Sequence, residues 1–140
     1  MIDYGNFKKA LKHLELQFQN YQNPDNMSLP VITQEAVKES VIQRFETCCD
    51  CMWKVLKRYL KEDLGIPDVP ESPKPVFRLA FVNNLLSSDM DFWLQYIDVR
   101  NGTAHDYSGE KAETALSLMS NFISDARRLY ETMSGDKLDA

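Results

Sequence analysis

The sequence predicts an all-α protein, an antiparallel up-and-down four-helix bundle with one additional short helix. Apolar residues recur at three- and four-residue steps over most of the chain, which is the period of a helix that is buried on one side. No segment alternates apolar and polar residues between turn residues, as a β-strand does. The 140 residues include only five glycines and six prolines, so the composition favours neither a disordered linker nor a Gly-rich all-β protein.

Two helices are predicted in the first half of the chain. The first spans residues 4–21 and ends at Asn23-Pro24-Asp25-Asn26, a sequence typical of turns. The second is long, begins near Thr33 and stops at Gly65-Ile66-Pro67. The apolar stripe of the first consists of Phe7, Leu11, Leu14, Phe18 and Tyr21. The stripe of the second consists of Val37, Val41, Phe45, Cys48, Met52, Val55, Leu56, Tyr59 and Leu60.

Residues 67–75 hold four of the six prolines and are predicted to form a stiff connector rather than a helix interior. A short third helix follows, with Val76, Leu79, Ala80 and Leu85 or Leu86 as its apolar residues. A fourth helix begins after Ser87-Ser88-Asp89, which offers N-cap residues, and breaks at Gly102. Its stripe consists of Met90, Trp93, Tyr96 and Ile97.

The last helix is predicted to begin at Ser108, a plausible N-cap residue, and the tail after Ser134 is expected to fray. Together the helices form one packed domain over residues 1–140, a usual size for a single domain. The stripe of the last helix consists of Ala112, Ala115, Leu116, Met119, Phe122, Ile123, Ala126, Leu129 and Met133.

The composition limits the classes of partner. A formal net charge of -5 argues against a protein that holds nucleic acid by general electrostatic attraction, although a local basic site remains compatible with it. Residues 1–20 intersperse charged and apolar positions, unlike a signal peptide, and no apolar run reaches the length of a membrane span. We therefore expect a cytoplasmic protein with no membrane partner.

Three cysteines, Cys48, Cys49 and Cys51, are clustered in the second predicted helix. They are too few and too close in sequence for a disulfide framework, and reduced thiols with a buried or interfacial packing role fit best. Cys48 and Cys51 have the Cys-x-x-Cys spacing, but a structural zinc ion needs further ligands and the chain has no second pair. No metal and no cofactor is predicted.

The segment from Arg100 to Tyr107 is the candidate functional site. Arg100 continues the apolar stripe of the fourth helix with a permanent cation. On an unbroken helix Arg100 and His105 would lie about 140° apart, but a break at Gly102 lets the chain fold back toward Arg100. An imidazole exchanges a proton near neutral pH and a guanidinium holds two phosphate oxygens, so the pair suits phosphoryl transfer without a metal.

RNA cleavage is the specific reaction we consider. His105 would remove the proton of a ribose 2′-hydroxyl while Arg100 stabilises charge at the phosphorus centre. One histidine cannot be base and acid at once, and a two-fold homodimer centred on this segment would supply a second.

Several of the candidate residues also have purely structural explanations. On composition alone, an arginine and a histidine near a helix end, such as Arg100 and His105, are more often a helix cap and a surface ion pair. Arg44 and Glu46, on the neighbouring helix, either orient the segment or form an ordinary ion pair. His13 lies in a Lys-rich stretch and is interpreted as a solvated residue. The remaining aromatic candidates, Trp53, Trp93 and Tyr96, are interpreted as core or interface packing rather than as a base-stacking platform.

The order of Arg100, four residues, His105, one residue and Tyr107, between the last two helices of a small bundle, resembles the HEPN superfamily. In particular, the chain is similar to the bacterial branch called nucleotidyltransferase substrate-binding proteins, or HepT-like toxins. The resemblance extends over nearly the whole chain. It includes an amino-terminal helix, a long helix with Arg44-Phe45-Glu46 and Trp53-Lys54, a Pro-rich connector, the motif and a closing helix.

The resemblance implies a homodimer that is encoded beside a small nucleotidyltransferase and forms a complex with it. In such a two-component system the helical protein is a metal-independent ribonuclease toxin and the nucleotidyltransferase is its antitoxin. Arg100 and His105 match the catalytic pair of the family, and Tyr107 matches the tyrosine that the partner modifies with AMP. Asn101 and Asp106 fall inside the motif as candidate binding residues.

Two other functions remain open at this point. The bundle could present a nucleotide or another substrate to the nucleotidyltransferase, with Arg100 and His105 as binding residues, and the acidic net charge fits this reading slightly better than an RNA enzyme. Alternatively, the chain is a structural adaptor, in which case Arg100→Ala changes assembly or stability and no activity.

Overall fold

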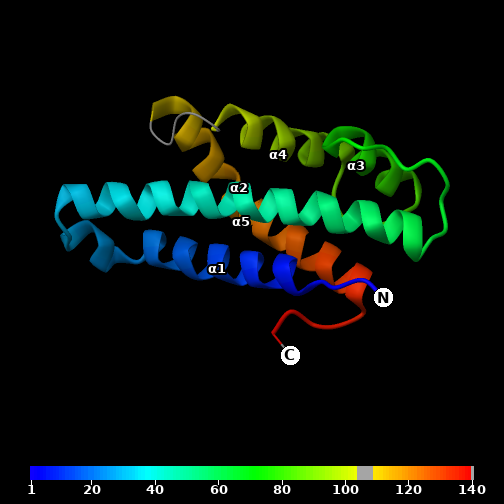
Figure 1. The fold of residues 1–140 in the computed structure, drawn as a ribbon. Coiled ribbons are helices and arrows are strands. Elements are labelled where there is room, and N and C mark those ends of the chain that lie inside the picture. Colours follow the sequence, from blue (N-terminus) through cyan, green and yellow to red (C-terminus); the bar gives the residue numbers. More distant parts are fainter. Residues whose placement is uncertain (104–108, 140) are drawn as a thin grey trace.

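The computed structural model describes residues 1–103 and 109–139, and over these residues the chain is helical and has no β-strand (Figure 1). The all-α prediction is confirmed. The elements are α1 (Gly5–Gln22), the 3₁₀ helix η1 (Pro24–Ser28), α2 (Val31–Glu62), α3 (Pro73–Val82), α4 (Met90–Gly102) and α5 (Gly109–Ser134).

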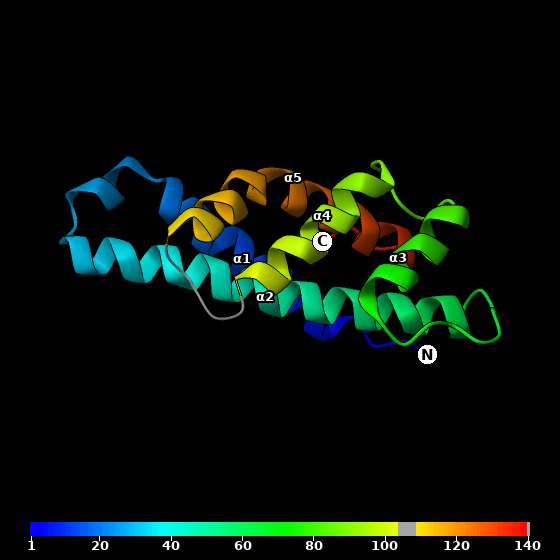
Figure 2. The ribbon, with the colours of Figure 1, turned by 90° about the horizontal axis from the view of Figure 1, so that it is seen from above.

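The helices run up and down as predicted, with the long α2 at the centre. In Figure 1, α1 lies along one side of α2 and runs antiparallel to it, while α3 and α4 follow one another along the other side. α5 runs back behind α2 and contacts α1, α2 and α4. Seen from above, α4 lies across α2 and α5 and contacts both helices (Figure 2). The short α3 and α4 together take the place of the third helix of the bundle.

A chain of buried aromatic rings connects four helices. Phe45 of α2 meets Phe122 of α5 with ring centroids 4.8 Å apart, and Tyr96 of α4 meets Phe122 at 5.2 Å. Trp93 continues the series to Phe77 of α3, with centroids 5.3 Å apart. Edge-to-face and offset ring pairs add stabilisation beyond the burial of their area. Trp93 and Tyr96 are fully buried and therefore belong to the core, whereas Phe77 is an aromatic core residue that the apolar pattern had not singled out.

Three predicted boundaries are corrected by the structure. α3 ends at Val82, so Leu85 and Leu86 lie in the loop after the helix and not on it. α2 begins at Val31, directly after Pro30 and two residues before Thr33. α3 begins at Pro73, so the end of the Pro-rich connector is the first turn of a helix. Proline is compatible with that turn because the first N–H groups of a helix have no intrahelical partner.

The start of α4 is fixed in a way that the sequence pattern did not predict. Asp89 occupies the N-cap position, but no side chain caps the helix. The hydroxyls of Ser87 and Ser88 instead donate to Asp125 of α5, over 3.3 Å and 2.6 Å. Tyr96 donates to the second carboxylate oxygen over 2.6 Å, and its burial together with this bond raises its pKa. Asp125 thus joins the loop before α4, and α4 itself, to α5.

The C-terminal tail is packed rather than frayed. Leu138 is fully buried, and Arg127 donates to both Glu15 of α1 and Asp139 of the tail. Within the described residues, none of the helices combines the length and the apolar character that crossing a membrane requires.

Candidate functional site

Arg100 lies in the last turn of α4, and its side chain reaches α2. Its Nε and Nη2 donate to the two carboxylate oxygens of Asp50 over 3.2 Å and 3.1 Å, and its Nη1 donates to Glu46 over 3.3 Å. The contact with Asp50 is therefore bidentate, a geometry that fixes the plane of the guanidinium. Arg100 therefore joins α4 to α2 through ion pairs with two carboxylates.

The local sequence explains why these groups meet. Trp93, Tyr96 and Ile97 are buried on one face of α4, and Arg100 is the next residue on that face. Glu46 and Asp50 are four residues apart on α2 and so share the face that α4 covers. Arg100, at the end of the buried stripe of α4, therefore faces the carboxylates of Glu46 and Asp50.

The two carboxylates differ in exposure, and the difference separates their roles. The side chain of Glu46 is 9% exposed, whereas that of Asp50 is 42% exposed. The buried Thr103, just beyond α4, places its hydroxyl 3.1 Å from the same Glu46 oxygen. Removing the cation from a buried carboxylate is costly, so Glu46 is the fixed anchor of Arg100, and Asp50 is the partner that solvent or a ligand reaches.

One cation thus faces two carboxylates. The hydrogen bond to Asp50 is the main reason why the pKa of Arg100 is raised, and burial acts in the opposite direction. A guanidinium in this state is well oriented, but its charge is neutralised locally. A phosphate oxygen that approaches Arg100 must compete with Asp50, the more exposed of the two partners.

The remaining residues of the predicted segment divide into two groups. Asn101 is exposed in the last turn of α4, and the helix ends at Gly102 as predicted, without the positive φ that would demand glycine there. His105, Asp106 and Tyr107, together with the N-cap prediction for Ser108, lie outside the described residues. Their proposed roles stay predictions.

Comparison with known proteins assigns the family. The family model described as "Nucleotidyltransferase substrate binding protein like" matches residues 2–135, nearly the whole chain. The chain belongs to this family. It is also 31% identical over 106 residues to the "Probable ribonuclease HepT" of Haemophilus influenzae, a match that covers 74% of this chain and 72% of the relative. The predicted membership of the HEPN superfamily, in its HepT-like branch, is confirmed.

Solved structures of the family have the same fold. A Haemophilus influenzae protein, described as revealing the fold of a substrate binding domain of a nucleotidyltransferase, has a TM-score of 0.84 at 27% identity, over 94% of this chain and 98% of that one. A Thermus thermophilus protein gives 0.75 at 27% identity, over 91% and 98%. A Shewanella oneidensis HEPN toxin, solved tri-AMPylated and in complex with an MNT antitoxin, gives 0.71 over 94% and 96%, and its 16% identity supports likeness of fold alone.

Sequence reasoning missed Asp50 and Thr103, and it left Glu46 as one of two alternatives. Glu46 orients Arg100, whereas Arg44 points toward α1 and donates to His13 over 3.2 Å. A usable signal was present, because Glu46 falls between buried residues of α2 where an unpaired carboxylate is unfavourable. A cation on the buried face of another helix is the natural partner of such a carboxylate. Arg100 is such a cation, because it continues the apolar stripe of α4.

The cysteines lie on α2 beside this cluster. Cys48 and Cys49 are buried, and Cys51 is partly exposed on the side of α2 that faces α1. Burial is the main reason why the pKa of each of the three thiols is raised, and the fully buried Cys48 and Cys49 are therefore poor nucleophiles. Among the residues described here, no group of three or more His, Cys, Asp and Glu side chains is arranged to hold a metal ion.

Proposed function

We propose that this chain is the helical partner of a minimal nucleotidyltransferase in a two-component, toxin–antitoxin-like system, and that it is a metal-independent ribonuclease. The observation that carries the proposal is the clamped Arg100 at the end of α4, directly before the segment with His105 and Tyr107. The similarity to a relative named as a probable ribonuclease supports it.

The proposed reaction is an internal transfer at phosphorus. His105 takes the proton of the ribose 2′-hydroxyl, the oxygen attacks the adjacent phosphodiester, and a 2′,3′-cyclic phosphate forms as the 5′-oxygen leaves with a proton. Arg100 stabilises the negative charge that develops on the phosphoryl oxygens. A second His105, from the other subunit of a homodimer, donates the proton to the leaving group.

The geometry around Arg100 supports this assignment. Glu46 is buried and accepts a hydrogen bond from the guanidinium, which orients it. Asp50 is more exposed, so its bidentate contact is the one that a phosphodiester would replace. Because a carboxylate and a phosphate offer similar pairs of oxygens, the exchange preserves the hydrogen-bond geometry of Arg100.

Regulation by the partner is the second part of the proposal. We infer that the nucleotidyltransferase transfers AMP from ATP to the hydroxyl of Tyr107, with release of pyrophosphate. The added phosphodiester places a negative charge within the motif, where it would compete with RNA for Arg100. The description of the Shewanella toxin as tri-AMPylated in complex with its antitoxin is the observation behind this inference.

A non-catalytic substrate-binding subunit is the second candidate function. The family description favours it, and so does the neutralisation of Arg100 by Glu46 and Asp50. In that case Arg100, His105, Asn101 and Asp106 bind a nucleotide that the nucleotidyltransferase uses, and no RNA is cut. Cytoplasmic location and the homodimer are common to both candidates and are also proposals.

The test uses the purified protein, free of nucleotidyltransferase, with RNA in the presence of EDTA. The ribonuclease proposal predicts products with 2′,3′-cyclic phosphate ends, which disappear in His105→Ala and Arg100→Ala. Arg78→Ala, which removes an exposed arginine of α3, serves as the matched control and should cleave like the wild type. If the wild type is as inert as His105→Ala on every RNA, and nucleotide binding depends on Arg100, the substrate-binding function replaces the ribonuclease.

A further inference from the structure

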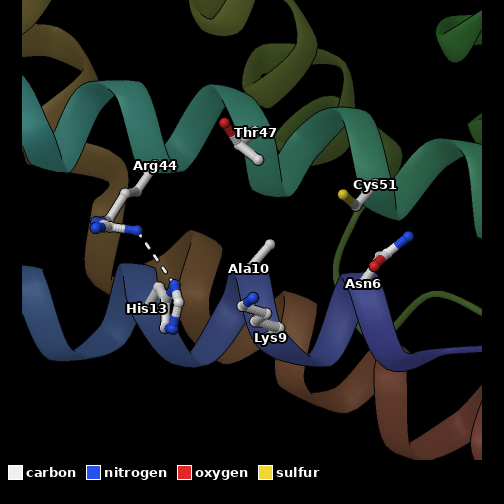
Figure 3. A pocket seen from close by; sticks show the side chains of 7 residues that line it. All are labelled: Asn6, Lys9, Ala10, His13, Arg44, Thr47 and Cys51. Atoms are coloured by element: carbon white, nitrogen blue, oxygen red, sulfur yellow. Dashed lines mark hydrogen bonds between the residues drawn. The ribbon is translucent and has the colours of Figure 1, made fainter.

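A pocket of about 320 Å³ opens between α1 and α2 (Figure 3). Lys9 and His13 of α1 and Arg44 of α2 supply its basic groups. The remaining lining residues are polar or small: Asn6, Ala10, Thr47 and Cys51. None of the lining residues carries a carboxylate, although the chain has 21 acidic residues against 16 lysines and arginines.

The hydrogen bond between Arg44 and His13 shows which groups the pocket offers. A guanidinium can only donate, so in the 3.2 Å contact His13 Nδ1 is the acceptor and the ring proton lies on Nε2. Within the described part of the chain, Arg44 has no carboxylate within salt-bridge distance. Among the described residues, Lys9 likewise has no carboxylate within salt-bridge distance. The pocket therefore combines an ammonium, a guanidinium and a ring N–H, all of which are donors suited to an anion.

The surface next to the pocket has the same character. A second hollow of about 420 Å³ lies along α1, shares Lys9 and His13 with the first, and adds Lys8 and Lys12. The sequence of α1 contains a single acidic residue, Glu15, and that carboxylate is held by Arg127. Phosphate groups are bound mainly by such clusters of lysine and arginine. This face is a local positive surface on a protein of net charge -5.

We propose that the α1–α2 pocket is a phosphate-binding subsite that holds a phosphodiester of single-stranded RNA as the strand crosses α2 toward Arg100. The pocket uses Arg44 and Thr47 of α2, whereas the Arg100 clamp uses Glu46 and Asp50. These residues lie at the same level of one helix, on faces roughly 120° apart. A helix with its side chains is about 10 Å wide, so one short strand can reach both sites.

The route toward Arg100 rests on the proposed ribonuclease function, but binding in the pocket does not. The first test therefore uses an oligonucleotide that cannot be cleaved, a fluorescent 2′-O-methyl RNA, and measures its affinity by anisotropy over a range of salt. Arg44→Gln and Lys9→Gln should each weaken binding about tenfold at low salt and lower the slope of log affinity against log salt by about 0.7. Arg78→Gln, the matched change on exposed α3, should alter neither quantity.

Cys51 gives a readout that is specific to the pocket. It lines the pocket and is partly exposed, while Cys48 and Cys49 are buried, so a bulky thiol reagent at mildly alkaline pH should label Cys51 first. The oligonucleotide should slow this labelling in the wild type and not in Arg44→Gln. Inorganic phosphate and ATP are compared at equal concentration, and RNA should protect at a lower concentration than either.

The outcomes separate the two proposals. If Arg44→Gln and Lys9→Gln bind the oligonucleotide like the wild type, or if ATP protects Cys51 and RNA does not, the RNA subsite is wrong. If RNA protects Cys51 but no RNA is ever cleaved, the subsite stands and the ribonuclease falls. If cleavage is present and Arg44→Gln leaves its KM unchanged, the ribonuclease stands and the subsite is overturned.

Discussion

Two arginines lie on either side of α2, and their surroundings give them opposite properties. Arg100 is 24% exposed and is held by Asp50 and Glu46, whereas Arg44 is exposed and contacts the ring of His13. The first is fixed in direction and locally neutralised, and the second retains its full charge and its freedom. The two arginines thus differ in the positive charge that they offer to a ligand, because only Arg100 is surrounded by carboxylates. A sequence motif identifies an arginine but does not show whether its charge is already neutralised.

The largest expected effect comes from Asp125, which supports α4 and not the α1–α2 pocket. Asp125→Ala leaves the buried Tyr96 hydroxyl without its acceptor and should lower the free energy of unfolding by about 3 kcal/mol, measured in urea. Asp125→Asn keeps an acceptor oxygen and should lose less. At temperatures where Asp125→Ala is still folded, RNA cleavage should fall more than oligonucleotide binding, and equal losses would show that the two sites are not independently supported.

Removing each arginine in turn should sharpen the contrast. Arg100→Met removes one ion-pair partner of the buried Glu46 and should cost about 2 kcal/mol, whereas Arg44→Met removes an exposed side chain and should cost less than about 0.5 kcal/mol. Because Arg100→Met also removes a proposed catalytic group, stability is the quantity to compare. The double variant with Glu46→Gln should recover part of the loss, and additive losses would mean that the two side chains are not coupled.

Neutralising Asp50 should have the smallest effect of the three changes. It should make the charge at Arg100 more like that of Arg44 in the α1–α2 pocket. Asp50→Asn frees part of the charge of Arg100, and because the Asp50 side chain is 42% exposed, the affinity for a non-cleavable RNA at low salt should rise only about three- to fivefold. The gain should vanish at high salt, where exposed charges are screened. If the double variant Arg100→Met/Asp50→Asn also bound RNA more tightly than Arg100→Met, the gain in affinity would not come from the freed charge of Arg100.

The sequence predicted those parts of the fold that depend on local periodicity. Apolar stripes identified the helices and placed Trp93 and Tyr96 in the core, because residues three and four apart share a helix face. It also drew attention to Arg100 as a cation on a buried stripe. Side-chain chemistry suggested His105 as the group that transfers a proton, whereas family resemblance was needed to assign a role to Tyr107, and both residues lie outside the described part of the chain.

What could not be predicted depends on contacts between distant residues. Ser87 and Ser88 were expected to cap α4, but their partner Asp125 lies 38 and 37 residues away, and nothing in the local pattern points to it. In the sequence, Asp50 has the pattern of an exposed helix residue. Its role as a partner of Arg100 follows only from the packing of α4 against α2. Leu138 belongs to a short polar tail, and its burial depends on the surface formed by the rest of the bundle.

The continuity of α2 has a consequence for substrate length. Val31–Glu62 contains neither glycine nor proline, so the carboxylates that hold Arg100 and the residues that form the α1–α2 pocket are carried by one rigid rod. The interval between the two sites is then set by helix geometry and not by the conformation of a loop. Under the proposed RNA subsite, a mononucleotide would occupy one site at a time, and only a strand with several phosphates would gain affinity from both sites.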